Sequence, residues 1–199
     1  MLNNNAAYKD DSDAKNYKQH FLYPGTIVIK SEPHQITTVL GSCIAVCLWD
    51  QERRMGGMNH YLLPQNGLND CLTPRYGNIA ISHLLQRILN SGGKKKNLVA
   101  KIFGGATVLQ NTASNISVGS RNIQIAYDIL KWEKIKLISQ DVGGHFGRKI
   151  MFNTLTGAVW VKRLQGNSFL LVNPATVQNM EKVKTETIPQ ALRILFKSG

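Results

Sequence analysis

Short apolar runs, rich in β-branched residues and separated by turn residues, occupy the first third of the chain. They predict strands at residues 26–30, 35–40, 43–49 and 57–63. Gly41-Ser42 separates the second run from the third, and Pro64 ends the fourth because proline cannot donate a hydrogen bond to a sheet. This part of the chain is therefore predicted to form a series of adjacent strands.

Two later segments carry apolar residues at helical spacing. The first begins at Thr73-Pro74, where threonine can cap a helix and proline suits its first turn, and it ends at Gly92-Gly93. The second begins near Gly119-Ser120. The residues expected to face inward are Ile81, Leu84, Leu85, Ile88 and Leu89 in the first helix, and Ile123, Ala126, Tyr127 and Leu130 in the second.

The remaining pattern adds strands at 98–103 and 136–141 and a hairpin formed by 149–153 and 157–163. A short strand at 168–172 and a terminal helix at 187–196 complete it. Because the helices do not alternate one for one with the strands, a doubly wound parallel sheet is disfavoured. The expected fold class is α/β of the α+β type: a layered sandwich of mainly antiparallel strands with helices packed outside.

The chain has 199 residues, 43% of them apolar, which suffices for one domain with a sizeable core. Residues 1–22 contain few apolar side chains and are expected to form a flexible N-terminal tail before a single domain over 23–199. The N-terminus lacks the apolar core of a signal peptide, and the longest apolar run, 36–49, is too short to cross a membrane. We therefore expect a cytoplasmic protein without membrane insertion, and an odd number of cysteines, 3, agrees with a reducing compartment.

Basic residues outnumber acidic ones, 24 to 12, which gives a formal net charge of +12. The lysines and aspartates of residues 1–20 balance each other, so the excess belongs to the rest of the chain. Such a charge attracts anionic partners, but it also simply keeps a protein soluble. A nucleic-acid binder is a class that the charge permits, although no motif of basic and aromatic residues supports it.

The segment 37–43 has the most chemical content, because it places Cys43 directly after Gly41-Ser42. The main-chain N–H groups of Ser42 and Cys43 could stabilise an oxyanion at such a turn and lower the pKa of the thiol. A nucleophile is one interpretation of Cys43; a core residue is the more frequent role of cysteine in an apolar strand. Packing explains Cys47 and Cys71 better.

A nucleophilic cysteine needs a base within hydrogen-bond reach, and His60 is the best placed of the 5 histidines. Suppose that 43–49 and 57–63 form an antiparallel hairpin in which Trp49 faces Gly56, or Asp50 faces Arg53. Cys43 and His60 then lie on the same face of the sheet as direct or diagonal neighbours. A register shifted by one residue would place them on opposite faces, and the sequence does not fix the register.

The other candidates are weaker. His20 lies in the tail, His83 on the polar side of a helix, and His145 in a glycine loop, where it is harder to dismiss. A zinc site would use Cys43, Cys47, His60 and Cys71 as ligands. It is disfavoured because cysteines four residues apart on a strand are separated by about 13 Å. No metal or organic cofactor is expected.

Glycine pairs recur at 56–57, 104–105 and 143–144, and none of them belongs to a phosphate-binding loop. They are either turns with close backbone packing or loops that surround one active-site mouth.

Several blocks, each weak alone, form a specific set in their order and spacing. They are Thr37-Thr38-Val39-Leu40-Gly41-Ser42-Cys43, Gly57-Met58-Asn59-His60, Leu63-Pro64, Tyr76-Gly77, Lys101-Ile102-Phe103-Gly104-Gly105-Ala106, Gly119-Ser120-Arg121-Asn122, and Asp141-Val142-Gly143-Gly144 with Gly147-Arg148-Lys149. Over residues 24–164 this set resembles the chemoreceptor glutamine deamidase family, CheD.

The resemblance implies an amidohydrolase that converts specific glutamine side chains of chemoreceptors (methyl-accepting chemotaxis proteins) to glutamate and releases ammonia. It assigns Cys43 as the nucleophile, His60 as the general acid and base, and Thr37 as the residue that orients His60; the adjacent Thr38 is the alternative if the alignment shifts by one residue. The implied fold is similar to the catalytic domain of cytotoxic necrotizing factor toxins. The implied partners are chemoreceptor cytoplasmic domains, at receptor arrays on the inner face of the membrane, and in some members a CheC-type phosphatase.

Other functions remain open at this point. A non-catalytic chemotaxis adaptor would bind receptors or the phosphatase and would not need Cys43. A cysteine peptidase would use the same residues and cleave peptide bonds instead of side-chain amides.

Overall fold

The computed structural model describes residues 17–67, 71–107 and 117–164. The chain divides into two compact units, 1–165 and 166–199, and all of these residues belong to the first. The strand expected at 168–172 and the helix expected at 187–196 lie outside the described residues.

A five-stranded sheet forms the middle layer of the first unit. Its strands, in spatial order, are β2 (Thr26–Lys30), β5 (Met55–His60), β4 (Ile44–Asp50), β6 (Leu98–Gly104) and β7 (Lys136–Val142). Neighbouring strands in it are antiparallel except β6 and β7, which are parallel. The central strand β4 is almost entirely buried, which explains its nearly unbroken apolar sequence.

A second, four-stranded sheet contains β1 (Lys18–Phe21), β3 (His34–Leu40), β8 (Gly147–Asn153) and β9 (Val159–Leu164), in that spatial order. Burial alternates strictly along β3, the pattern of a strand with one face against a core. The hairpin predicted near 149–163 is present as the antiparallel pair β8–β9.

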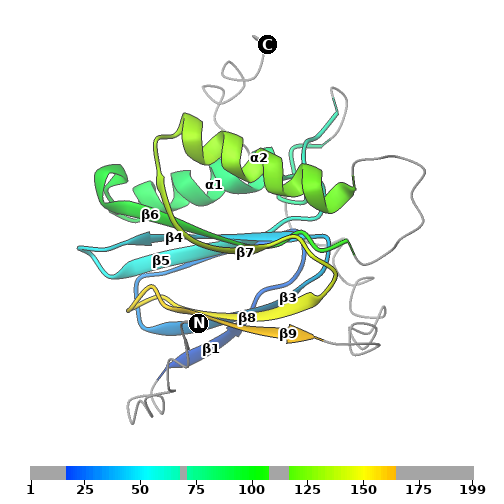
Figure 1. The fold of residues 1–199 in the computed structure, drawn as a ribbon. Helices are drawn as coiled ribbons and strands as arrows, with labels where there is room; N and C mark the ends of the chain where they lie inside the picture. The colour runs from blue at the N-terminus through cyan, green and yellow to red at the C-terminus, as the bar shows by residue number, and fades with distance from the viewer. Residues whose placement is uncertain (1–16, 68–70, 108–116, 165–199) are drawn as a thin grey trace, which may run out of the picture. The chain divides into compact units, whose positions relative to one another are not determined.

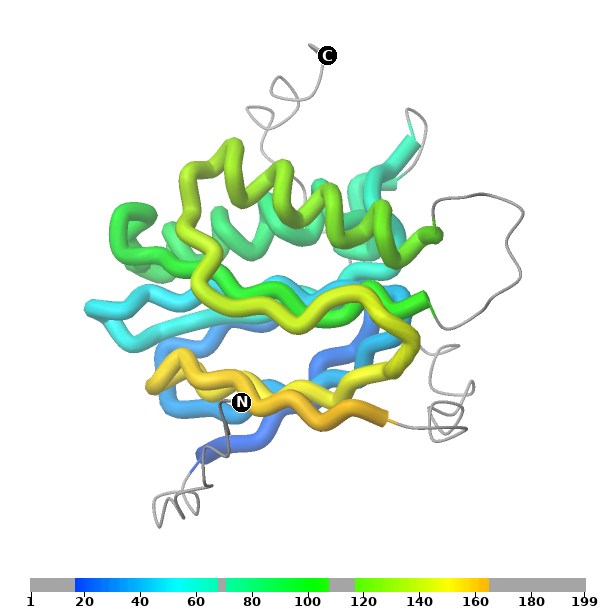
Figure 2. The backbone as a smooth tube through the Cα atoms, in the orientation of Figure 1, coloured from blue at the N-terminus to red at the C-terminus, as the bar shows by residue number. Residues whose placement is uncertain are grey.

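Two helices, α1 (Gly77–Asn90) and α2 (Val118–Trp132), cover the face of the five-stranded sheet that points away from the second sheet, and a short 3₁₀ turn, η2 (Lys95–Asn97), precedes β6 (Figures 1 and 2). One apolar cluster fills the space between helices and sheet. Another fills the space between the two sheets and includes Leu22, Ile36, Leu40, Ala45, Cys47, Met58, Phe103, Ile150 and Phe152. The α+β class with mainly strands is therefore confirmed.

The first helix begins later than the sequence predicts. Its N-cap is Tyr76, which makes no side-chain capping bond, and the Thr73 carbonyl instead accepts the Tyr76 N–H in a preceding turn. Ile81, Leu84, Leu85 and Ile88 are buried as predicted, whereas Leu89 is partly exposed at the end of the stripe.

The first strand lies inside the segment predicted to be a tail. β1 pairs in parallel with β3, from Lys18 opposite His34 to Phe21 opposite Thr37. As an edge strand it is largely exposed, and this is why its polar composition resembles that of a tail. Leu22, which follows it, is only 1% exposed. In the part of the chain that the structure describes, no helix is long and apolar enough to cross a membrane.

Candidate active site

The register of β4 and β5 decides whether Cys43 and His60 can meet. Trp49 pairs with Gly56, one of the two registers that favour the pair, and an isolated bridge joins Ile44 to Tyr61 in the same register. Cys43 is therefore a diagonal neighbour of His60 at the strand ends, about 8 Å away or less between Cα atoms. Cys43 packs against the cluster between the sheets, and His60 shares the face of Met58, which belongs to that cluster.

His60 is almost fully buried, with 1% of its surface exposed. The Thr38 hydroxyl oxygen lies 2.8 Å from His60 Nδ1. The His60 main chain pairs with Thr26, and its carbonyl accepts the Gly25 N–H at 2.7 Å. Burial lowers the pKa of His60 from its ordinary value of 6.5 to about 4, so the imidazole is neutral near pH 7. A neutral imidazole can act as a base.

The hydroxyl beside His60 belongs to Thr38 and not to Thr37, the residue that the resemblance assigns. Successive side chains of a strand point to opposite faces. The buried positions of β3 include Thr38, and Thr37 is among the half-buried positions between them. The Thr37 carbonyl instead accepts the Leu22 N–H at 2.8 Å.

The turn that presents Cys43 is held by three successive carbonyls. The Gly41 carbonyl accepts the Ala106 N–H and the Cys43 carbonyl accepts the Gly105 N–H, both at 2.8 Å. Between them, the Ser42 carbonyl accepts a hydrogen bond from Asn122 Nδ2 at 2.9 Å. With its carbonyls bonded to the two residues that follow β6 and to α2, the turn has a defined conformation.

Asn122 links this turn to the next segment. It is fully buried, and its Nδ2 also donates to the Leu62 carbonyl at 2.9 Å. Its own main-chain carbonyl accepts the Tyr61 hydroxyl at 2.6 Å. One side chain on α2 therefore ties together the chain before Cys43 and the chain after His60.

The amides of the turn remain available for chemistry. Among the described residues the Ser42 N–H has no main-chain or side-chain acceptor, and the Cys43 N–H faces its own thiol. An oxyanion that forms on a carbonyl attacked by Cys43 would lie beside this N–H, as an oxyanion hole requires.

The resting thiol differs from the sequence-based expectation. Burial raises the pKa of Cys43 to about 11, and the single N–H beside the sulfur offsets only part of this effect. Removal of water disfavours the thiolate more than one amide dipole stabilises it. The resting pair is therefore a neutral thiol and a neutral imidazole.

Of the three glycine pairs, two lie beside the Cys43 turn and one serves close backbone packing. Gly104 has φ +109°, and a Cβ built there would collide with the Cys43 carbonyl, so only glycine fits this close approach. The Gly143 N–H donates to the Gly104 carbonyl at 2.9 Å, which brings 143–144 to the same region. By contrast, 56–57 serve packing, against Phe152 on one side and Leu84 on the other.

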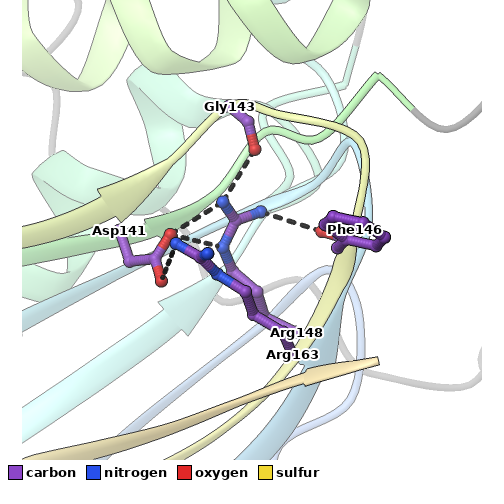
Figure 3. Close-up of polar contacts among 5 residues, drawn as sticks. All are labelled: Asp141, Gly143, Phe146, Arg148 and Arg163. Carbon is purple, nitrogen blue, oxygen red and sulfur yellow. Dashed lines mark hydrogen bonds and ion pairs between the residues drawn. The ribbon is translucent and has the colours of Figure 1, made fainter. Parts of the chain in front are cut away.

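A buried arginine fixes the loop that includes Gly143. Arg148 donates from Nε and Nη2 to the Asp141 carboxylate, at 2.9 and 2.8 Å, and its other hydrogen bonds go to the Gly143 and Phe146 carbonyls (Figure 3). Arg163 lies 3.4 Å from the same carboxylate. These residues line a surface hollow of about 240 Å³, beside which Phe146 is 48% exposed.

The remaining candidates are dispersed. His145 is exposed in this loop and His20 lies on β1. Cys47 is buried in the core, as predicted, whereas Cys71 is exposed and does not serve packing. The described part of the chain contains no group of three or more His, Cys, Asp or Glu placed to hold a metal ion. Because 44–50 is a strand, the geometry that disfavours the zinc site applies.

Sequence reasoning missed the supporting residues of the site. Asn122 and Gly104-Gly105-Ala106 belong to blocks that carry the resemblance, but no chemistry could be assigned to them until the structure placed them at the Cys43 turn. Leu22, whose main-chain carbonyl accepts the Thr38 hydroxyl, gave no signal, because this contact is made by its main chain and the residue follows a polar segment.

Comparison with known proteins agrees with the family resemblance found in the sequence. The family model described as CheD chemotactic sensory transduction matches residues 62–163. A "Probable chemoreceptor glutamine deamidase CheD" of Trichlorobacter lovleyi is 44% identical over 153 residues, 77% of this chain and 95% of the relative. A protein of the same name from Sulfurimonas denitrificans is 42% identical over 154 residues, 77% of this chain and 99% of the relative. This chain belongs to the CheD family.

Proposed function

We propose that this protein is a chemoreceptor glutamine deamidase that hydrolyses glutamine side chains to glutamate through a thioester on Cys43. The names of its relatives support the substrate class. The observation that carries the chemistry is the placement of Cys43 and His60 as neighbours on one face, with Thr38 against the imidazole. A thiol without a neighbouring base would not support this chemistry.

The first step forms the thioester. His60 takes the thiol proton as the Cys43 sulfur attacks the side-chain amide carbon, and the negative charge on the oxygen falls beside the Ser42 and Cys43 N–H groups. Because both groups rest neutral, proton transfer accompanies attack and no preformed ion pair is needed. The C–N bond then breaks, and His60 returns the proton to the departing ammonia.

The second step regenerates the enzyme. Water attacks the thioester carbon while His60 accepts one of its protons, and the C–S bond breaks to leave glutamate and a reprotonated Cys43. In this proposal Cys43 is the nucleophile, His60 is the general acid and base, and the N–H groups of Ser42 and Cys43 are the oxyanion donors.

We assign the orientation of His60 to Thr38. A matched pair of variants distinguishes the role of Thr38 from that of Thr37, because Thr37→Val and Thr38→Val each remove one hydroxyl, from opposite faces of the same strand. Thr38→Val is expected to lower kcat by on the order of 100-fold. Thr37→Val should leave kcat close to that of the wild type, and the reverse order would return the role to Thr37.

The proposed function is tested by mass spectrometry of a chemoreceptor cytoplasmic fragment incubated with the wild-type protein, Cys43→Ala or Cys71→Ala. Cys71 is a suitable control because it is an exposed free thiol, whereas Cys43 is half-buried. We expect the mass gain of amide-to-acid conversion with the wild type and Cys71→Ala, and none with Cys43→Ala. Cleaved peptides in place of deamidated ones would identify a peptidase.

Two other outcomes would also overturn the assignment. An equal gain with Cys43→Ala would mean spontaneous deamidation or another nucleophile. No gain with any protein, together with stable co-purification with the fragment, would favour the non-catalytic adaptor, which binds receptors or a CheC-type phosphatase. The likeness to the fold of cytotoxic necrotizing factor toxins is part of the same proposal.

The product explains why the reaction matters for a receptor. Deamidation adds a negative charge to the receptor surface and creates a carboxylate that a methyltransferase can esterify. Like charges three or four residues apart destabilise a helix, so each conversion changes the packing energy of receptor helices.

A further inference from the structure

The Thr38 hydroxyl lies between two groups that both compete for its single proton. Its oxygen is 2.8 Å from His60 Nδ1 and 2.8 Å from the main-chain carbonyl oxygen of Leu22. A hydroxyl can donate one hydrogen bond and accept two. The proton of the Thr38 hydroxyl and the proton of the neutral His60 ring can therefore be arranged in only two ways along these two hydrogen bonds.

One arrangement gives both protons an acceptor. The Leu22 carbonyl has no proton and can only accept, so the Thr38 hydroxyl donates to it. The hydroxyl oxygen must then accept from His60, which places the imidazole proton on Nδ1. His60 Nε2 keeps its lone pair, and this atom is buried without a hydrogen-bond partner among the described residues.

The opposite arrangement leaves two defects. If Thr38 donated to His60 Nδ1, two oxygens 2.8 Å apart would face each other with no proton between them. The imidazole proton would also move to Nε2, where a buried N–H would have no acceptor among the described residues. Buried donors without acceptors are strongly disfavoured.

We propose that the main-chain carbonyl of Leu22 selects the Nδ1–H tautomer of His60, through the Thr38 hydroxyl, and so leaves Nε2 as the base. Leu22 is thus a positioning residue, in a segment that the sequence assigns to a tail. The role given to Nε2 rests on the proposed deamidase function; the tautomer itself does not.

The segment that carries this carbonyl is fixed on both sides. The Leu22 N–H donates to the Thr37 carbonyl at 2.8 Å, and its side chain is buried in the cluster between the sheets. Three residues later the Gly25 N–H donates to the His60 carbonyl at 2.7 Å. The chain therefore wraps around His60, which keeps the Leu22 oxygen in place.

Nitrogen NMR of the His60 ring in the full-length protein near pH 7 tests the proposal directly, with His60→Gln to assign the signals. We expect a protonated Nδ1 and an unprotonated Nε2. A wild-type ring protonated on Nε2 would overturn the proposal. Thr38→Ser should keep the tautomer and most of kcat, whereas Thr38→Val should release it and lower kcat with little change in KM.

The contribution of the carbonyl is isolated by semisynthesis. Replacing the amide between Leu22 and Tyr23 with an ester weakens the Leu22 carbonyl as an acceptor and changes no side chain. An ester between Ser31 and Glu32, in an exposed bend, is the matched control. We expect a shifted tautomer ratio and a kcat several-fold lower only for the first ester; identical spectra for both would refute the role of Leu22.

The two proposals can fail separately. A wild-type protein with the Nδ1–H tautomer but without deamidation would refute the proposed function and leave the role of Leu22 intact. A protein that deamidates its substrate with an Nε2–H ring would refute the role of Leu22 alone.

Discussion

Removing the Asn122 side chain should damage the enzyme in two measurable ways. In Asn122→Ala, the Ser42 and Leu62 carbonyls each lose a donor at 2.9 Å. A buried acceptor without a partner costs about 1–3 kcal/mol, so two together cost about 2–6 kcal/mol. Two gains offset this loss: Asn122 Oδ1 is itself buried without a partner among the described residues, and alanine is the better helix former by about 0.6 kcal/mol. The net loss in the free energy of unfolding is about 1–2 kcal/mol.

Activity should fall further than stability explains. The Ser42 carbonyl is the middle one of the three that hold the Cys43 turn, and a shift of about 1 Å in a reacting group can cost ~100-fold in rate. Urea unfolding measures the first effect, and deamidation kinetics at a temperature where the variant is fully folded measure the second. Gln124→Ala, an exposed position on the same helix, is the control and should stay within about 0.5 kcal/mol of the wild type. A stability within about 0.5 kcal/mol of the wild type, together with an unchanged kcat, would refute the anchoring role.

Three further predictions concern His60, Arg148 and Ser42. Burial lowers the His60 pKa from 6.5 to about 4, so the contribution of the neutral ring to stability is fully present above pH 6.5 and is lost as the pH falls towards 4. Over this range the free energy of unfolding of the wild type, measured in urea, should fall by about 3 kcal/mol. The His60→Gln variant should not show this loss. Arg148→Met should lower the free energy of unfolding by about 3 kcal/mol, because it removes the two nitrogens that donate to the Asp141 carboxylate, and Arg148→Lys should recover only part of this loss. Equal stability of the wild type and both variants would contradict the structural role of this ion pair. Ser42→Ala should leave kcat/KM within about twofold, since the proposal uses only its N–H; a large loss would show that the hydroxyl takes part.

The sequence predicts the strands of the core well because their signal is local. β3 and β4 combine β-branched or apolar composition with clear ends, and the structure places them within one residue of the expected bounds. The β4–β5 register is a different matter. Two turn pairings both brought Cys43 and His60 to one face, and only packing in three dimensions selects the register with Trp49 opposite Gly56.

The differences between the expected site and the structure have a physical origin as well. Thr37 and Thr38 are identical in type, and a shift of one residue on a strand exchanges the faces of the sheet. The pKa of Cys43 could not be predicted from the turn alone, because the dominant effect is burial by chain segments distant in sequence. Leu22 contributes through a carbonyl, which every residue type possesses, so no residue pattern can reveal it.

The placement of the site across two sheets has a consequence for how the enzyme loses activity. Thr38 belongs to the four-stranded sheet and His60 to the five-stranded sheet, and the turn that carries Cys43 passes from one to the other. Neither sheet alone contains both Thr38 and His60. Deamidation therefore measures whether the sheets are docked: in mild denaturant, activity should vanish at the point where the interface between the sheets loosens, while the hydrogen bonds within each sheet still persist.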